Sequence, residues 1–465
     1  MKKILLLSIL FMSLNLNAQC WNSIYESGIG YNCFKIRIDG TLWSNGDGIL
    51  INGITDPNTG NGYIFTTPIQ IGTNTNWMSV YNGVYHIVAI KVDRTLWAWG
   101  DNFSGQLGNG TTISNYTPTQ IGIATNWKSV TSGYSSNLAI KTDGTLWSWG
   151  SNNKGQLGIG STIDNYTPIQ IGTASNWSFV SINFSSSFAI KTDGTLWAWG
   201  ENLSGLLGDG TTINKTTPTQ IGTANNWKSV TAGMSTITAI KTDGTLWAWG
   251  LNIVGQLGNG TTIDNYTPTQ IGNETNWKSV SSGNWHSLAI KTDGTLWAWG
   301  INDYGQLGDG TTINKTTPTQ IGTANNWKSV TAGNGFSTAL KTDGTLWACG
   351  RNDSGQIGDN STIDRTTITQ INCINLGIET FDKNRFFLYP NPTKDQITIN
   401  FDIQININGW NYKIVNTLGQ EVLYGVLSSQ ESVVDLNDVK SQGIYFVKIY
   451  DSVNNLIDTK KIIIK

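Results

Sequence analysis

Short segments in which apolar and polar residues alternate recur along most of the chain, separated by glycine, asparagine and threonine. In one stretch of 50 residues the alternating segments predict four strands, A to D, at 127–131, 137–141, 145–149 and 167–171. An Asp-Gly pair between strands B and C is typical of a two-residue hairpin, and a proline in strand D suits an edge strand. The pattern therefore predicts an antiparallel four-stranded unit.

This unit is repeated with a fixed period. The sequence Asp-x-Thr-Leu-Trp begins at Asp93 and at every fiftieth residue up to Asp343, and an earlier copy begins at Asp39. The longer first spacing indicates an insertion at residues 49–65. Seven tryptophans open the A strands: Trp21, Trp77, Trp127, Trp177, Trp227, Trp277 and Trp327. Seven copies of a four-stranded unit predict an all-β, seven-bladed β-propeller.

Tryptophan also explains why the units would stack. In strand C, alternation places Trp147 and Trp149 on one face of the blade and smaller residues on the other. Each buried tryptophan removes about 150–250 Å² from water, so a tryptophan face is expected to pack on the small-residue face of the next blade. The second tryptophan is missing in two copies, the first (Asn45) and the last (Cys349), where a ring is expected to close.

Ring closure suggests a pairing of the cysteines. Cys20 and Cys373 match positions that are three residues apart in an internal connection between blades, so a seventh blade that meets the first would bring them together. A Cys20–Cys373 disulfide is expected, and local Cys20–Cys33 and Cys349–Cys373 pairs are the competing arrangement. In the chain-entropy model, closing so long a loop stabilises by up to about 4–5 kcal/mol.

Composition and the N-terminus narrow the class of protein. The 29 Lys+Arg and 31 Asp+Glu give a net charge of −2. This balance lacks the excess of positive charge that is typical of proteins that bind nucleic acid or an anionic membrane. Residues 1–18 begin with a basic pair and a short apolar run and are expected to be a signal peptide, and no later segment is apolar enough to be transmembrane. The protein is therefore expected to be secreted or on the outer cell surface.

The repeats also carry a family resemblance. The sequence AWGDNFSGQLG at residues 98–108 and its copies resemble the regulator of chromosome condensation repeat, and Gly-x-x-His-x-x-Ala segments at Gly83 and Gly283 match it too. The resemblance covers about residues 21–372 and implies a seven-bladed propeller, here residues 19–372. The family's nuclear exchange-factor activity is not implied, because the other copies lack the histidine and the chain is expected to be exported.

A different pattern follows the repeats. Residues 373–385 are expected to be a linker, and residues 386–465 contain six or seven short strands, which predicts a small immunoglobulin-like β-sandwich. The Tyr-Pro-Asn-Pro sequence at Tyr389, the Gly-x-Tyr strand at Gly443 and the basic last strand resemble the C-terminal sorting domain of type nine secretion substrates in Bacteroidetes. This resemblance implies recognition by the outer-membrane export machinery; the alternative is a small adhesive sandwich.

The sequence offers no catalytic pattern. The two histidines, His86 and His286, are four units apart, so they are expected to pack turns rather than to share a metal or a catalytic dyad. The repeated aspartates could form a ring of carboxylates, but hairpin turns explain them more simply. Gly-x-Gly sequences lack the lysine and helix of a phosphate loop, and no serine lies in a nucleophile elbow. Neither an enzyme nor a cofactor or metal site is expected.

Comparison of the seven units with one another indicates a binding surface. Strands and hairpins repeat almost unchanged, whereas the A–B turn and the start of the C–D loop vary. Both connections leave the same side of an up-and-down blade, so the variation gathers on one face, where exposed aromatic residues suit a protein or a glycan. The residues expected there are Tyr85, Phe103, Tyr134, Phe184, Met234, Trp285, Tyr304 and Phe336.

Two functions are consistent with these observations. The first is a secreted, non-catalytic binding module that recognises an extracellular protein or glycan through this face and is exported by the type nine machinery. The second is a structural or adhesive surface component without a single ligand, in which case the variation is drift in unconstrained turns. Replacing the varied aromatic residues would separate the two, because binding would change in the first case only.

Overall fold

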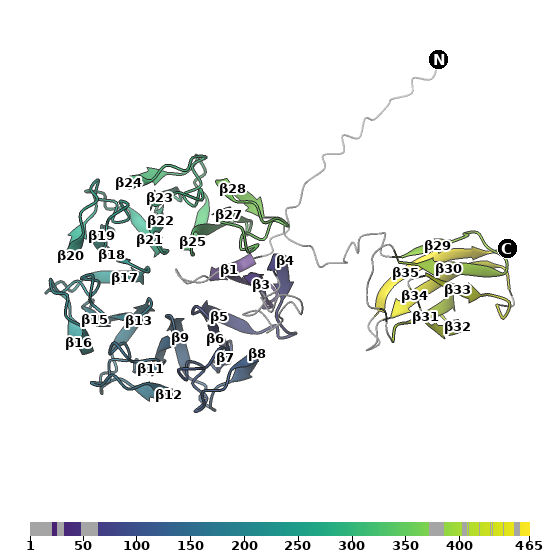
Figure 1. The fold of residues 1–465 in the computed structure, drawn as a ribbon, viewed down its shortest axis with the longest axis horizontal. Coiled ribbons are helices and arrows are strands. Elements are labelled where there is room, and N and C mark those ends of the chain that lie inside the picture. Colours follow the sequence, from purple (N-terminus) through teal and green to yellow (C-terminus); the bar gives the residue numbers. More distant parts are fainter. Residues whose placement is uncertain are drawn as a thin grey trace, which may run out of the picture. The chain divides into compact units, whose positions relative to one another are not determined.

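The computed structural model describes residues 21–25, 32–47 and 64–371, together with 386–465 apart from gaps at 402–406, 408, 418, 428, 430, 440 and 451–455. The chain divides into two compact units, residues 1–374 and 375–465. Within the first unit, the described residues form seven four-stranded antiparallel sheets, each with its strands in sequence order. They are arranged as the blades of a disc, with the first strand of each blade near the centre and the fourth at the rim (Figure 1). The predicted seven-bladed propeller is confirmed.

The strands follow the repeat closely. Blade 1 comprises β1 (Trp21–Tyr25), β2 (Cys33–Arg37), β3 (Leu42–Asp47) and β4 (Ile64–Gln70). Blade 2 comprises β5 (Trp77–Asn82), β6 (His86–Lys91), β7 (Leu96–Gly100) and β8 (Asn115–Gln120). Blade 3 comprises β9 (Trp127–Ser132), β10 (Ser136–Lys141), β11 (Leu146–Gly150) and β12 (Asn165–Gln170).

The remaining blades repeat these lengths. Blade 4 comprises β13 (Trp177–Ile182), β14 (Ser186–Lys191), β15 (Leu196–Gly200) and β16 (Lys215–Gln220). Blade 5 comprises β17 (Trp227–Ala232), β18 (Thr236–Lys241), β19 (Leu246–Gly250) and β20 (Asn265–Gln270). Blade 6 comprises β21 (Trp277–Ser282), β22 (His286–Lys291), β23 (Leu296–Gly300) and β24 (Lys315–Gln320), and blade 7 comprises β25 (Trp327–Ala332), β26 (Phe336–Lys341), β27 (Leu346–Gly350) and β28 (Arg365–Ile371).

The repeated Asp-Gly-Thr-Leu-Trp sequence builds the B–C hairpin. The Asp143 carboxylate accepts hydrogen bonds from the Thr145 amide at 3.0 Å and the Thr145 hydroxyl at 2.6 Å. The Trp147 indole then donates to that hydroxyl at 2.8 Å. The ammonium of Lys141 lies 3.7 Å from the ring centre of Trp147 and 4.7 Å from that of Trp127. The aspartates are therefore turn residues, and the threonine hydrogen bonds hold the pKa of Asp143 below its ordinary value.

In blades 3 to 6 the second tryptophan of the pair donates a hydrogen bond to the preceding blade. The Trp149 indole donates at 3.0 Å to the carbonyl of Gln106 in the C–D loop of blade 2, and Trp199 donates at 2.9 Å to Gln156 in blade 3. The Trp149 ring packs in one cluster with Leu96 and Ala98, which lie on one face of the preceding blade. This is the predicted packing of a tryptophan face on a small-residue face.

The ring closes where the tryptophan pattern is broken. In blade 1 the amide nitrogen of Asn45 donates at 2.8 Å to the carbonyls of both Gly355 and Gln356 in blade 7. In blade 7 the thiol of Cys349 donates to the Gln306 carbonyl at 3.5 Å. Both residues thus contact the carbonyl at which other blades use an indole. The predicted Cys20–Cys373 disulfide and the signal peptide lie outside the described residues, and so do residues 373–385.

One hairpin departs from the repeat, and we expect its repair to stabilise the protein. Arg94 holds a φ of +65° where Gly144 holds +79° in the next blade, and a side chain is strained in this left-handed region. The Arg94→Gly variant should raise the free energy of unfolding by about 1 kcal/mol, measured by denaturant unfolding. The reverse change, Gly144→Arg, should destabilise, because a Cβ there would lie 2.1 Å from the Ser175 carbonyl oxygen. A less stable Arg94→Gly protein would contradict this explanation.

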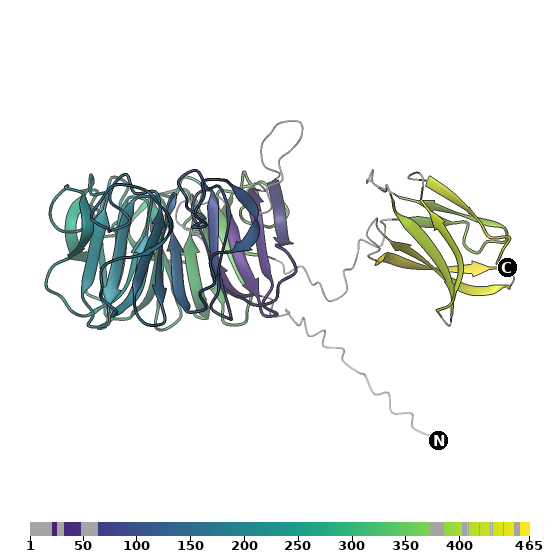
Figure 2. The same cartoon turned by 90° about the horizontal axis from the view of Figure 1, so that it is seen from below.

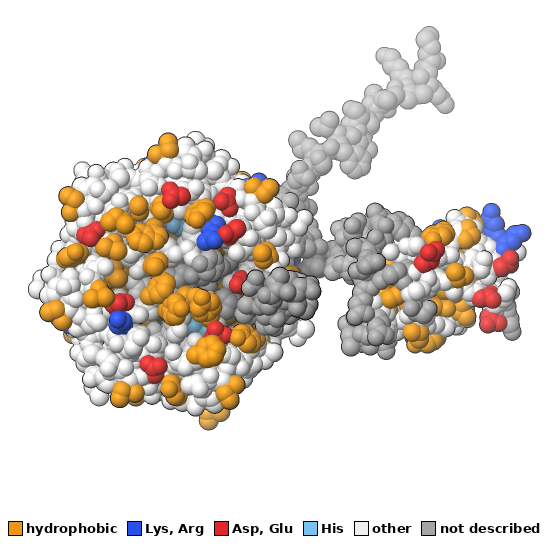
Figure 3. Space-filling view, viewed as in Figure 1, with side chains coloured by type: hydrophobic (Ala, Val, Ile, Leu, Met, Phe, Trp, Pro, Cys, Tyr) orange, Lys and Arg blue, Asp and Glu red, His pale blue; other side chains and the backbone are white. Residues whose placement is uncertain are grey.

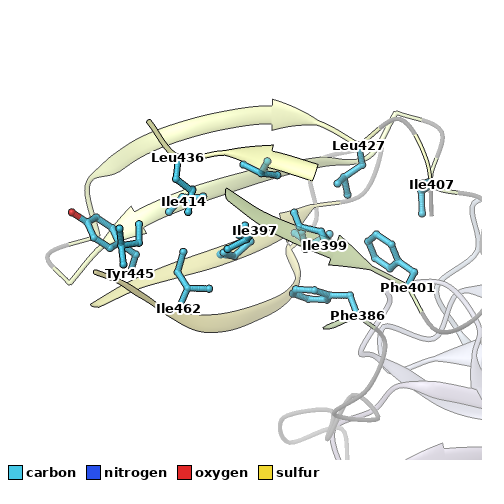
Figure 4. Close-up of a cluster of buried hydrophobic side chains, with 14 residues drawn as sticks. Phe386, Ile397, Ile399, Phe401, Ile407, Ile414, Leu427, Leu436, Tyr445 and Ile462 are labelled. Carbon is cyan, nitrogen blue, oxygen red and sulfur yellow. The ribbon is translucent and has the colours of Figure 1, made fainter. Parts of the chain in front are cut away.

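The second unit is a small β-sandwich of two sheets. One sheet contains β29 (Phe387–Tyr389), β30 (Gln396–Asn400) and β33 (Glu431–Asp435). The other contains β31 (Asn411–Asn416), β32 (Glu421–Val426), β34 (Gly443–Tyr450) and β35 (Leu456–Ile464). Alternating apolar residues of both sheets share one core, which includes Phe386, Ile397 and Ile462 (Figure 4). None of the described residues forms a helix that could cross a bilayer.

Candidate functional site

The two ends of the blades form two chemically different faces of the disc, which is seen from its edge in Figure 2. At one end, the A–B turn and the C–D loop of a blade are joined, as between the Ser151 amide and the Ser135 carbonyl at 2.8 Å. At the other end, the B–C hairpin meets the D–A connection, as between the Thr142 amide and the Asn126 carbonyl at 2.8 Å. We call these the loop face and the hairpin face.

Aromatic side chains form an arc around the centre of the loop face. The ring centres of Tyr85 and Tyr134 are 6.0 Å apart, and those of Tyr134 and Phe184 are 5.1 Å apart in a stacked pair. Tyr85 is 46% exposed and Tyr134 39%. Half-buried Met234 and Trp285 occupy the turns of blades 5 and 6. The structure therefore places five of the predicted residues in neighbouring A–B turns.

The C–D loops add exposed apolar side chains to the same face. Phe103 is 77% exposed and Tyr304 42%, while Leu203 and Ile253 occupy the equivalent position of Phe103 in their blades. The guanidinium of Arg351 lies 5.5 Å from the ring centre of Tyr304 and pairs with Asp353 at 2.5 Å. Figure 3 shows the loop face, which can be recognised by the pale blue of the histidines that follow A–B turns. Hydrophobic side chains gather near the centre of this face and also lie at its margin.

The prediction for one loop-face residue is wrong. The sequence predicts Phe336 on the loop face, but in the structure its side chain is fully buried. It is the first residue of β26, one position after the turn, and its ring lies against Gly333, where a Cβ would come within 2.4 Å of it. Phe336 therefore occupies the position of His86 and His286 in their blades and contributes to the core beneath the face.

An outer set of isoleucines also belongs to this face and was not predicted. The same residue stands at this position in blades 2 to 7, so variation between the units does not indicate it. The signal that would have found them is an apolar residue in an otherwise polar loop. All are at least 64% exposed: Ile113, Ile163, Ile213, Ile263, Ile313 and Ile363.

In blades 2 to 7 a buried asparagine fixes the C–D loop that carries the isoleucine. In blade 3, the amide nitrogen of Asn152 donates to the carbonyls of Ser161 and Ile163, both at 3.0 Å. Its oxygen accepts a hydrogen bond from the Leu157 amide at 2.9 Å. These bonds satisfy three backbone groups inside the loop, so the loop is held in shape before any partner arrives.

The two histidines support the turns and bridge the blades. The Nε2 atom of His86 lies 2.8 Å from the Asn137 side-chain oxygen, and that of His286 lies 2.9 Å from the Ser337 hydroxyl. Both side chains are buried, and desolvation lowers the pKa of each to about 4. They are therefore neutral at physiological pH. The described residues contain no cluster of three His, Cys, Asp or Glu side chains that could hold a metal ion.

These histidines predict a pH dependence of stability. Between pH 6.5 and 4 the unfolded chain takes up protons that the folded chain does not, so stability falls as pH is lowered through this range. The loss should reach about 3 kcal/mol for each histidine. Replacing His86 and His286 with phenylalanine, as at Phe336, should flatten unfolding free energy against pH in this window. An unchanged slope in the double variant would contradict the assignment.

Comparison with known families identifies both parts of the chain. The regulator of chromosome condensation (RCC1) repeat matches residues 94–140, 143–190, 193–240, 243–290 and 293–340. A second model of this repeat matches residues 127–156, 277–306 and 327–356. The secretion system C-terminal sorting domain matches residues 387–465. No curated protein matches the sequence.

Solved structures with the same fold are distant in sequence. Human WBSCR16 is 18% identical, with a TM-score of 0.63 over 72% of this chain and 94% of that chain. Prp20p from Saccharomyces cerevisiae, described with its binding to Gsp1p and histones, is 19% identical, with a TM-score of 0.63 over 80% of this chain and 92% of that chain. Yeast RCC1 bound to Kap60 is 18% identical, with a TM-score of 0.63 over 82% and 93%. These similarities show the fold alone.

Proposed function

Because the chain belongs to the regulator of chromosome condensation repeat family and carries a secretion sorting domain, we propose that it is a secreted binding module. The sorting domain directs it to the cell surface or the extracellular space through the type nine route. Its loop face would contact an extracellular protein or glycan without catalysing a reaction. Residues 1–18 would serve as the signal peptide that begins this export.

The observation that supports this proposal most strongly is the exposed apolar surface of the loop face. Three kinds of side chain contribute: the aromatic arc, the C–D loop residues such as Phe103 and Leu203, and the isoleucines. Exposed apolar patches of several hundred Å² on a monomer usually mark interaction sites. The C–D loops that hold the second and third kinds are fixed by buried asparagines such as Asn152, so ordering these loops adds little cost to binding.

Residues at equivalent positions in other blades can replace the exposed aromatic side chains in a test of this proposal. At the Tyr85 position three other blades carry serine, and at the Tyr134 position two carry asparagine. We therefore expect a variant with Tyr85→Ser, Tyr134→Asn, Phe184→Asn and Trp285→Ser to fold. Its affinity for extracellular proteins and for a glycan array should fall at least tenfold, about 1.4 kcal/mol or more, because central aromatic residues dominate interface energies.

A matched control removes apolar surface from the opposite face. Ile38 and Val92 are 58% and 64% exposed in B–C hairpins, where the other five copies carry threonine. The Ile38→Thr, Val92→Thr variant should bind as the parent does. Equal binding by the parent and the loop-face variant would reject the proposal and favour an adhesive component without a single ligand.

A further inference from the structure

The hairpin face, opposite the loop face, carries a set of exposed lysines at the start of the inner strands. Each inner strand bulges after its first tryptophan; in blade 3, Trp127 pairs with Lys141 but Ser129 pairs with Ile140, so the residue between them is extra. The bulged residue is a lysine in four of the seven blades. These residues are all exposed and we call them the collar: Lys128, Lys228, Lys278 and Lys328.

The collar lies at one mouth of the central cavity. Lys128 and its counterpart Ser178 line this cavity of ≈360 Å³, which extends along the inner strands to Ser132 and Asn183 at the loop face. Neighbouring inner strands are in contact around the ring, so Lys228, Lys278 and Lys328 stand on three successive strands, β17, β21 and β25. The Lys328 ammonium donates to the Asn22 carbonyl in blade 1 at 2.9 Å.

The positive charge of the collar is only partly balanced nearby. The hairpin aspartates lie on the same face, but each is next to its own cation two residues earlier in the chain, as Asp143 is next to Lys141. Glu274 is paired at 2.8 Å with Lys291, which is also the cation next to Asp293, so the two carboxylates of blade 6 share one cation and offset one of the four collar charges. Among the described residues, no carboxylate lies within ion-pair distance of any collar lysine. The excess charge is therefore concentrated at the centre of the face.

Hydroxyl groups continue inward from the collar. Ser129, Thr131, Ser181, Thr231 and Ser281 line the cavity. The Thr231 hydroxyl donates to the Val280 carbonyl at 3.1 Å, and the Ser181 and Ser281 hydroxyls accept from the Ala232 and Ala332 amides at 3.0 Å. A hydroxyl has one donor and two acceptor positions, so Thr231 keeps acceptor capacity and the two serines keep their donor for a polar ligand. We propose that the collar and the mouth of this cavity bind an anionic glycan, with the lysines on its phosphate, sulfate or carboxylate groups and the cavity hydroxyls on its sugar hydroxyls. Nucleic acid fits less well, since a compact collar bordered by aspartates does not follow an extended line of phosphates.

The test measures retention of the full chain on immobilised dextran sulfate, polygalacturonate and phosphomannan, with uncharged dextran as the baseline. The collar variant carries serine at all four positions, the residue that blade 4 has naturally at Ser178. We expect the parent to bind at least one of the three anionic glycans and the collar variant to bind it at least tenfold more weakly. The binding should weaken with added salt in the parent, and this salt dependence should be smaller in the variant.

A control variant with the same net charge distinguishes binding at the collar from a general effect of the protein's charge. It removes four cations of the loop face by changes to residues found in other blades: Lys154→Ser, Lys215→Asn, Lys315→Asn and Arg365→Asn. Equal weakening in both variants, no retention of the parent on any anionic glycan, or equally strong binding of single-stranded DNA would each overturn the proposal. The loop-face aromatic variant should keep its anionic-glycan binding, so failure of one proposal is distinguishable from failure of the other.

Discussion

The Trp199→Ala variant should lose about 3–5 kcal/mol of unfolding free energy, measured by denaturant unfolding. The indole is fully buried between blades 3 and 4, and its nitrogen donates to the Gln156 carbonyl at 2.9 Å. Truncation would leave a cavity and remove one of the two hydrogen bonds to this carbonyl, which would keep only the bond from the Ser187 hydroxyl at 2.7 Å. We therefore also expect faster hydrogen exchange in residues 151–160, a part of the loop face.

The neighbouring tryptophan of the same strand is the control. Trp197 is half-buried and donates to the Thr195 hydroxyl within its own blade at 2.9 Å. Trp197→Ala should cost less stability and leave exchange in residues 151–160 unchanged, since its bond does not cross to the next blade. Equal destabilisation of the two variants, with faster exchange in residues 151–160 in both, would contradict this account. It would show that Trp199 and Trp197 do not have different roles, one between blades and the other in the hairpin.

The Asn45→Ala variant should be destabilised by about 3 kcal/mol or more, although only a short side chain is removed. Two carbonyls of blade 7 would lose the Asn45 donor, and of these the Gly355 carbonyl would keep its bond from the Gly358 amide at 3.0 Å. The buried Lys35 ammonium would also lose the Asn45 side-chain oxygen, which accepts its hydrogen bond at 2.5 Å. Because these contacts join blade 1 to blade 7, hydrogen exchange should increase at β1 and β28 before it increases in the central blades.

A double-variant cycle tests the part of this effect that involves the lysine. The other copies carry alanine at the Lys35 position, for example Ala139, so Lys35→Ala introduces the residue that the rest of the ring uses. We expect Asn45→Ala to cost less in the Lys35→Ala background than in the parent. Purely additive effects would show that the buried ammonium does not depend on Asn45.

The repeat pattern was sufficient to predict the blade and its stacking. Strand alternation and the Asp-Gly hairpin are local features, and the tryptophan pairs recur at a fixed position of every internal unit, so the contact of one blade with the next could be inferred from the period. The sequence also marked Asn45 and Cys349 as the points of closure. It did not reveal that Asn45 donates to blade 7 and holds Lys35, because that arrangement depends on contacts between segments about 310 residues apart.

The binding surface was predictable only in part. Variation between copies located Tyr85, Tyr134 and Phe103, since turns at the ends of blades are free to differ. It failed at Phe336, where a shift of one residue moves a side chain from the turn into the strand and hence into the core. It also failed at the isoleucines such as Ile163, because the same residue occupies this exposed position in each of blades 2 to 7 and so shows no variation.

Hydroxyl-radical footprinting would locate the contact surface of the secreted protein. Full-length protein is labelled alone and after saturation with the extracellular material that it retains, and modified residues are mapped by mass spectrometry. We expect protection of Tyr85, Tyr134, Phe184 and Trp285 on the loop face, with unchanged labelling of the hairpin-face Val92. Protection confined to the hairpin face, or no protection at the four loop-face residues, would show that partners do not bind where the exposed aromatic side chains lie.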